Sequence, residues 1–145
     1  MLKINEIAPN FEAETTSGKI DFHNWASDSW VILFSHPKDF TPVCTTELGY
    51  MAKIEREFTS RNCKLIGLSI DSLDDHNRWK KDIEEVQGVS VNYPLIADED
   101  LDIAKLYNML PLEEQADNSR TAMTNATVRS VFLIDPDKKI RMMLT

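Results

Sequence analysis

Hydrophobic positions in this chain follow two patterns, continuous runs and recurrence every three or four residues, which together predict alternating strands and helices. Continuous apolar runs of strand length lie at 30–35, 64–70 and 93–98, and such runs are typical of strands buried on both faces of a sheet. Between them, hydrophobic residues recur every three or four positions, which predicts two amphipathic helices. These positions are Leu48, Met51, Ile54 and Phe58, then Trp79, Ile83 and Val86. Ser72, followed three residues later by Asp75, predicts the start of the second helix.

Both ends of the chain predict paired strands. Apolar residues on either side of Ser17 and Gly18 predict a hairpin within 8–22, and the segment 127–144 predicts two strands joined by a turn. A short helix is expected at 100–109, and the polar stretch 112–127 is expected to form a mobile loop. The alternation indicates an α/β sandwich with a central mixed β-sheet flanked by helices, and the 145 residues suit a single domain.

Composition and charge limit the classes of partner that the chain is expected to bind. The 24 acidic residues outnumber the 16 basic ones and give a formal net charge of -8, which argues against nucleic acid and anionic membranes as partners. No apolar run has the length of a membrane span, and the first residues lack the apolar core of a signal peptide. With two cysteines and no such signal, we expect a reducing compartment, which is the cytoplasm by default, although an organelle stays open.

One of the two cysteines, Cys44, follows the first continuous apolar run and opens the first amphipathic helix. Reactive groups collect at strand-to-helix junctions of open α/β sheets, and the first turn of a helix favours a thiolate. A thiol with a pKa near 8.5 is about 3% ionised at pH 7, and reaching about 90% requires roughly 3.4 kcal/mol of preferential stabilisation. Because a helix end alone is too weak for that, a fixed cation is expected nearby.

Arg129 is the candidate cation. By strand alternation it shares a face with Val131 and Leu133, in a run apolar enough to be buried on both sides. A buried arginine needs a partner, and both a catalytic role beside Cys44 and an internal ion pair with a carboxylate such as Glu47 stay open. Cys44 could itself be a small core residue, although its polar flank FTPVCTTE argues against that interpretation.

The segment HPKDFTPVCTTELG places Pro37, Thr41 and Cys44 in the spacing P-x-x-x-T-x-x-C. This spacing resembles the active-site signature of the peroxiredoxin family. Further segments between residues 8 and 141 fall in the order of that family, so the resemblance covers nearly the whole chain. The HP before the motif and the TPVCTTEL around the cysteine are similar to the one-cysteine group of the family, which includes peroxiredoxin 6.

This resemblance implies a thioredoxin-like fold and a peroxidase that acts through Cys44. The thiolate would attack the O–O bond of hydrogen peroxide or an organic hydroperoxide and become a sulfenic acid. Thr41 and Arg129 would donate hydrogen bonds to the peroxide oxygens, while Pro37, which has no N–H group, would stiffen and shield the loop. Glu47 would orient Arg129 by a charge-assisted pair.

The resemblance also implies partners for this chemistry. No cofactor and no metal are expected, and an external thiol, glutathione or a thioredoxin-like protein, would recycle the sulfenic acid at Cys44. A homodimer is expected. Cys63 opens an apolar strand and is expected to be structural, whereas His36 either shapes the pocket or packs at a strand end. An alternative function is a peroxide sensor or a holdase that signals through oxidation of Cys44.

The end of the sequence departs from the family pattern. One-cysteine relatives continue past the equivalent of RMMLT with a second active-site arginine and a small C-terminal domain. We therefore expect residues 1–145 to form the thioredoxin-like domain with that C-terminal domain absent. A fragment, an ordered part of a longer protein and a minimal form all stay open, as does a resolving cysteine beyond Thr145.

Three further functions are not expected from the sequence. Glu47 occupies the second position of a C-x-x-C motif, which excludes dithiol exchange. The stretch SDSWV, which contains Ser29, lacks both glycines of the G-D-S-W-G motif that phospholipase relatives carry. His76 has no second ligand at metal spacing, so we expect it on a solvated helix face.

Overall fold

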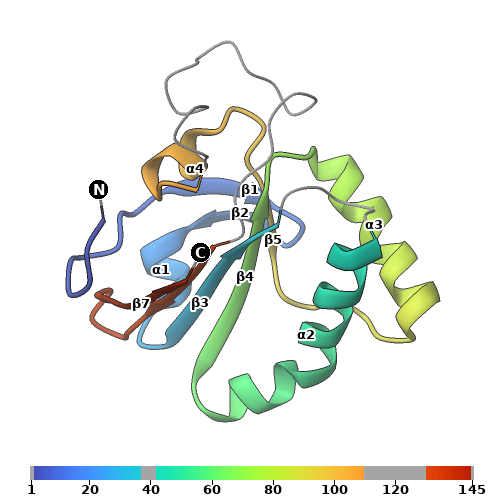
Figure 1. Ribbon diagram of the computed structural model, residues 1–145, viewed down its shortest axis with the longest axis horizontal. Helices are drawn as coiled ribbons and strands as arrows, with labels where there is room; N and C mark the ends of the chain where they lie inside the picture. Colours follow the sequence, from blue (N-terminus) through green and yellow to red (C-terminus); the bar gives the residue numbers. More distant parts are fainter. Residues whose placement is uncertain (1, 37–41, 110–129, 145) are drawn as a thin grey trace.

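The computed structural model describes residues 2–36, 42–109 and 130–144, without the side chains of residues 42–45 and 47. These residues form a seven-stranded mixed sheet in the order β2-β1-β5-β4-β3-β6-β7 (Figure 1). The strands are β1 (Glu12–Thr15), β2 (Gly18–Asp21), β3 (Trp30–Ser35), β4 (Cys63–Ser69), β5 (Leu95–Ala97), β6 (Val131–Ile134) and β7 (Ile140–Leu144). The helices are α1 (Phe22–Ala26), α2 (Pro42–Ser60), α3 (Leu73–Gln87) and α4 (Asp102–Leu106).

The helices cover the two faces of the sheet in pairs. Leu48 of α2 and Trp79 of α3 pack with Phe34 and Leu95 in one buried cluster, whereas α1 and α4 contribute to a second cluster on the opposite face. Figure 1 shows α2 and α3 side by side, away from α1 and α4. The described part of the chain is therefore a three-layer α/β sandwich, as the sequence predicts.

Strand β3 lies at the centre of the sheet and explains its mixed character. Every residue of β3 pairs in parallel with β4, and four residues pair antiparallel with β6. Strand β3 lies between two other strands, and other side chains pack on both faces of the sheet there. Its own side chains must therefore be apolar on each face, and the run WVILFS supplies them. The predicted bounds of 30–35 are confirmed.

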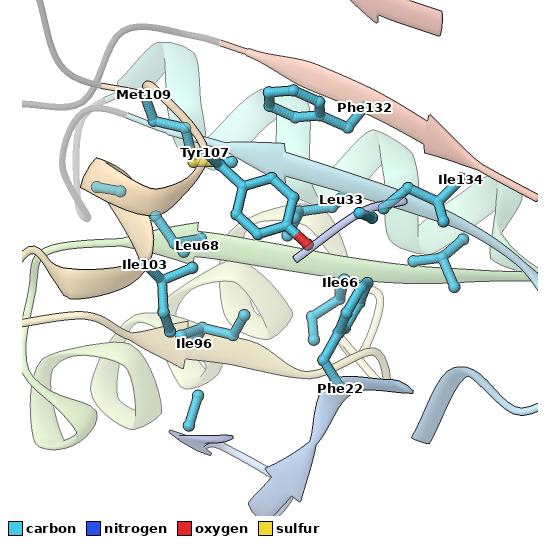
Figure 2. Close-up of a cluster of buried hydrophobic side chains, with 14 of the residues drawn as sticks. Phe22, Leu33, Ile66, Leu68, Ile96, Ile103, Tyr107, Met109, Phe132 and Ile134 are labelled. Atoms are coloured by element: carbon cyan, nitrogen blue, oxygen red, sulfur yellow. The ribbon is translucent and has the colours of Figure 1, made fainter. Parts of the chain in front are cut away.

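The cluster on the α1 and α4 side is built around aromatic rings (Figure 2). Tyr107 follows α4, is fully buried and donates its hydroxyl proton to the Pro9 carbonyl at 2.5 Å. Its ring meets Phe132 edge-on at a centroid distance of 5.4 Å, and meets Phe11 similarly at 5.9 Å. These contacts attach the N-terminal segment to the sheet, and each such ring contributes about 1.5–3 kcal/mol by its burial.

Helix α3 begins at the residue that its sequence predicts. The Ser72 hydroxyl accepts a hydrogen bond from the Asp75 N–H at 3.1 Å, and Gly88 ends the helix in the left-handed region at φ 69°. Trp79 and Ile83 are fully buried, whereas Val86, on the same predicted face of the helix, is 70% exposed. Val86 keeps the same helical register, and its exposure reflects its place in the last turn.

Both predicted hairpins are present in the described residues. In the β1–β2 turn, the Thr15 hydroxyl donates to the Gly18 carbonyl at 2.6 Å, and Gly18 has a φ of 98°. In the β6–β7 turn, the Asp135 carboxylate accepts hydrogen bonds from the Lys139 N–H and the Arg141 guanidinium. Although burial of Asp135 opposes ionisation, these bonds hold the pKa of its carboxyl below the usual range.

Candidate active site

The candidate site forms where β3 ends, β6 begins and α2 passes over the sheet. The Ser35 N–H donates to the Ser130 carbonyl at 3.0 Å, and the Ser130 N–H donates to the Ser35 hydroxyl oxygen at 3.0 Å. These two bonds join segments 95 positions apart in the chain. The end of β3 is therefore fixed beside the residue that follows Arg129.

Cys44 is the third residue of α2, so its backbone lies in the first turn of a 19-residue helix. The strand-to-helix junction that the sequence predicts for Cys44 is confirmed. The side chains of Cys44 and Glu47 fall outside the description, and Pro37, Thr41 and Arg129 lie outside the described residues. The roles expected for these five residues therefore stay predictions.

His36 is the predicted site residue whose side chain the structure does describe. It is 1% exposed, and its backbone N–H donates to the Leu68 carbonyl at 3.0 Å, which continues the pairing of β3 with β4 by one residue. The His36 ring lies 4.9 Å from the Trp79 ring and 5.9 Å from the His76 ring, measured between centroids. His36 thus packs at a strand end and also lines a pocket, and its role at a peroxide site stays a prediction.

That pocket has a volume of about 510 Å³ and lies between α2 and the sheet. Its wall is mostly apolar, and its polar side chains gather near the end of β3. The lining residues are Ile32, Phe34, Ser35, His36, Leu48, Tyr50, Met51, Ser130, Val131 and Leu144. Such a pocket admits a small polar group beside His36 and an apolar group further along β6 and β7.

Cys63 lies at the other end of the same parallel strand pair. It pairs with Trp30 at the start of β3, whereas His36 follows the end of β3, so about 20 Å along the strand separates Cys63 from His36. Cys63 is 8% exposed, and burial raises the pKa of its thiol. A buried, protonated thiol at this place has the properties of a structural residue.

The prediction for His76 is wrong, because the residue is buried rather than solvated. It is 0% exposed, and its ring Nε2 lies 2.9 Å from the Ile96 carbonyl oxygen. His76, Trp79 and Ile83 form the buried stripe of α3. The sequence contained this signal, since His76 precedes Trp79 by three positions and Ile83 by seven, which is helical spacing.

Ser29, from the stretch SDSWV, and His23, a histidine that a lipase mechanism would need near it, have other partners. The Ser29 hydroxyl donates to the Asn62 side-chain oxygen at 2.9 Å, and the His23 ring Nε2 lies 2.7 Å from the Ala8 carbonyl oxygen. Within the ranges that the structure describes, no group of three or more His, Cys, Asp or Glu side chains could hold a metal ion. Nor is any helix in those ranges long and apolar enough to cross a bilayer.

Comparison with known proteins identifies the family. The model of the AhpC/TSA family matches residues 4–143. The chain is 49% identical over 144 residues to 1-Cys peroxiredoxin from Dictyostelium discoideum, and 50% identical over 145 residues to Peroxiredoxin-6 from Mus musculus. These matches cover 99% and 97% of this chain but only 56% and 63% of the two relatives. The chain thus spans somewhat more than half the length of these curated relatives.

A solved structure gives the same result. The yeast mitochondrial 1-Cys peroxiredoxin, studied for its thiol resolving mechanism via glutathione/thioredoxin systems, superposes with a TM-score of 0.87 at 48% sequence identity. The match covers 100% of this chain and 68% of that one. The predicted thioredoxin-like fold with a mixed sheet is confirmed by these neighbours. These relatives are named 1-Cys peroxiredoxin and Peroxiredoxin-6, and the chain belongs to the AhpC/TSA family.

Proposed function

We propose that this chain is a thiol-dependent peroxidase that reduces hydrogen peroxide and organic hydroperoxides at Cys44. The thiolate attacks one peroxide oxygen, the O–O bond breaks, and the other oxygen takes a proton and leaves as water or an alcohol. The sulfur is oxidised to a sulfenic acid while the peroxide accepts two electrons. The observation that carries the proposal is the place of Cys44 in the first turn of α2, the helix that lines the pocket beside His36.

The other site residues have roles that follow from this chemistry. As the O–O bond breaks, negative charge grows on the departing oxygen, and Thr41 and Arg129 donate hydrogen bonds to it. The bonds between Ser35 and Ser130 support this role, because they hold the residue next to Arg129 at the end of β3. Glu47 orients the Arg129 guanidinium, and Pro37 shields the loop.

An external thiol completes the cycle. One thiol condenses with the sulfenic acid to give a mixed disulfide and water, and a second thiol releases Cys44 as the reduced form. The burial of Cys63 at the far end of β3 and β4 supports an external reductant. Glutathione or a thioredoxin-like protein is the proposed reductant, by analogy with the yeast relative. We further propose a cytoplasmic homodimer, with the mitochondrial relative as the contrasting case for location.

The test is the consumption of hydrogen peroxide with excess thiol by the Cys44→Ser and Cys63→Ser variants. We expect Cys44→Ser to lose the reaction and Cys63→Ser to keep most of the wild-type rate, because only Cys44 lies at a helix start beside the pocket. Equal losses in both variants would overturn the one-cysteine mechanism. If the wild type consumes a single peroxide per Cys44 even with excess thiol, the chain is a sensor rather than an enzyme.

A further inference from the structure

Two buried rings of α3 lie beneath His36 and have no role in the peroxidase chemistry described above. His76 and Trp79 stand three residues apart on α3, so they share one face of the helix, and both are 0% exposed. Their ring centroids lie 5.9 Å and 4.9 Å from that of His36, at interplanar angles of 67° and 51°. His36 therefore has the pocket on one side and the two rings of α3 on another.

His76 is itself attached to the sheet. Its Nε2 lies 2.9 Å from the carbonyl oxygen of Ile96, in the middle of β5. A carbonyl oxygen can only accept a hydrogen bond, so Nε2 carries the proton and donates it, which fixes the tautomer of the ring. The bond also fixes the rotation of the imidazole, because only one ring orientation directs Nε2–H at that carbonyl.

A buried histidine at this position lowers the stability of the fold unless its polar ring makes an interaction that an apolar side chain could not make. Burying an imidazole costs free energy that an apolar side chain of similar volume avoids, and the hydrogen bond to Ile96 offsets that cost. What the histidine adds over a leucine or phenylalanine is a fixed ring direction, since an apolar side chain in the same space is held by packing alone. The ring of His36 packs against this fixed imidazole at an interplanar angle of 67°.

We propose that His76 is a positioning residue for the peroxide site: its planar side chain, fixed to β5 by the bond to Ile96, sets the orientation of the His36 ring at the wall of the pocket. The proposal rests on the peroxidase function proposed above. The side chains that form a catalytic or binding site must be held within about 0.5 Å and 10–20° of their productive geometry, and the residues behind them provide that restraint. Here α3 would provide the restraint from beneath the site, without contact with peroxide.

The variants His76→Gln and His76→Asn test this proposal as a matched pair. The glutamine amide nitrogen stands as many bonds from Cβ as Nε2 does, so it can donate to the Ile96 carbonyl, whereas the asparagine amide is one bond too short. The measurement is the second-order rate of Cys44 oxidation by hydrogen peroxide in a Cys63→Ser background. We expect His76→Gln to react within about threefold of the parent and His76→Asn at least about tenfold more slowly.

Ile83→Ala is the control for a general loss of stability. Ile83 is fully buried on the same stripe of α3 but is not one of the rings packed on His36. We expect this variant to unfold at a lower urea concentration than His76→Asn and yet to keep the parent rate. Equal rates in His76→Gln and His76→Asn, whether normal or slow, would overturn the proposal, as would a slow reaction in Ile83→Ala.

A second readout separates this inference from the proposed function. The imidazole nitrogens of His36 can be observed by NMR in the parent and both His76 variants, with no need for peroxide. We expect the His36 signals to shift and broaden in His76→Asn and to stay near the parent positions in His76→Gln. If the parent consumes no peroxide, the proposed function fails, and unchanged His36 signals in His76→Asn would still refute the positioning role.

Discussion

Asp98 is a carboxylate held at the start of α4 under conditions that oppose its charge. It is 5% exposed, and burial raises its pKa to about 6, with a smaller contribution from the charges of Asp102 and Asp100. Its two oxygens accept hydrogen bonds from the Ile103 and Ala104 N–H groups at 3.1 Å and 2.7 Å, which work in the opposite direction. Asp98 thus fastens α4 to the end of β5 while its own ionisation is unfavourable.

This residue should give the protein a measurable pH dependence. The folded pKa lies above the ordinary value of 3.8, so the folded state keeps a proton that the unfolded state has lost. The free energy of unfolding should therefore decrease as the pH rises from about 4 to about 6, by an order of 2–3 kcal/mol from this group. Asp98→Asn should lose that part of the slope. Urea unfolding of both proteins between pH 4 and pH 7 measures it, and parallel pH profiles would contradict the prediction.

Residues that belong to a local motif could be predicted from the sequence, and residues whose role depends on a distant partner could not. Cys44 stands beside a proline and two threonines in the printed order, so its junction is visible in one segment. His76 contacts His36 and Ile96, which lie 40 and 20 positions away. The helical spacing of His76 with Trp79 and Ile83 indicates a buried face, but no local pattern shows which distant residues the ring contacts there.

At the scale of the elements, the sequence predicts strands most accurately where the sheet continues on both sides. The central strand β3 has the predicted bounds, whereas β5 is limited to Leu95–Ala97 within the predicted 93–98. Pro94 has no N–H to donate, and the Asp98 side chain turns to cap α4. The carboxyl end of β5 is thus set by the hydrogen bonds between the Asp98 side chain and the first turn of α4, which the pattern of hydrophobic residues does not reveal.

Gly67 lies in the middle of β4, where the neighbouring side chains leave little room for a larger residue. A Cβ at this position would lie 2.9 Å from the Leu95 side chain and 3.0 Å from the Phe34 ring, both buried in the sheet core. Gly67→Ala should therefore lower the free energy of unfolding by about 1–3 kcal/mol, since neither neighbour can move without displacing others. Chemical denaturation measures this change.

Gly49 provides the contrast. A Cβ there would lie 2.6 Å from Cγ and 3.1 Å from Cβ of Gln87, so the Gln87 side chain would have to change rotamer and α3 would have to shift slightly. Alanine favours the interior of α2 over glycine by about 1 kcal/mol, which offsets part of this cost, so Gly49→Ala should destabilise the protein less than Gly67→Ala. If Gly49→Ala destabilised the protein more than Gly67→Ala, the crossing of α2 and α3 would be tighter than the β4 packing.

At the scale of the whole molecule, α2 and α3 cover one end of the sheet more fully than the other. The pairing register places Leu133 opposite Met142 and Val131 opposite Leu144, on the face that carries α2 and α3. Val131 and Leu133 are half-buried, and Met142 and Leu144 are 41% and 54% exposed. Figure 1 shows β7 well away from both helices. This apolar surface adjoins β7, the last strand of the sheet in the described residues.

The outer edge of β7 is only partly occupied. At its start, Ile140 exchanges backbone hydrogen bonds with Asn5 and Glu6 of the N-terminal segment. From Arg141 onward, no strand of the described chain pairs with that edge. An unpaired edge next to exposed apolar side chains is a template for a further strand. A second copy of the same chain fits it by symmetry, since β7 of each copy can pair antiparallel with the other.

The proposed homodimer should therefore depend on β7. Leu144→Lys places a charge at the exposed end of this strand, so we expect it to shift the protein from dimer to monomer in sedimentation equilibrium at micromolar concentration. Val86→Lys is the matched control, because Val86 is 70% exposed on α3 and the substitution adds the same charge away from the edge. It should leave the dimer intact. A wild-type chain that sediments as a monomer, or equal dissociation by both substitutions, would show that β7 is not the dimer interface.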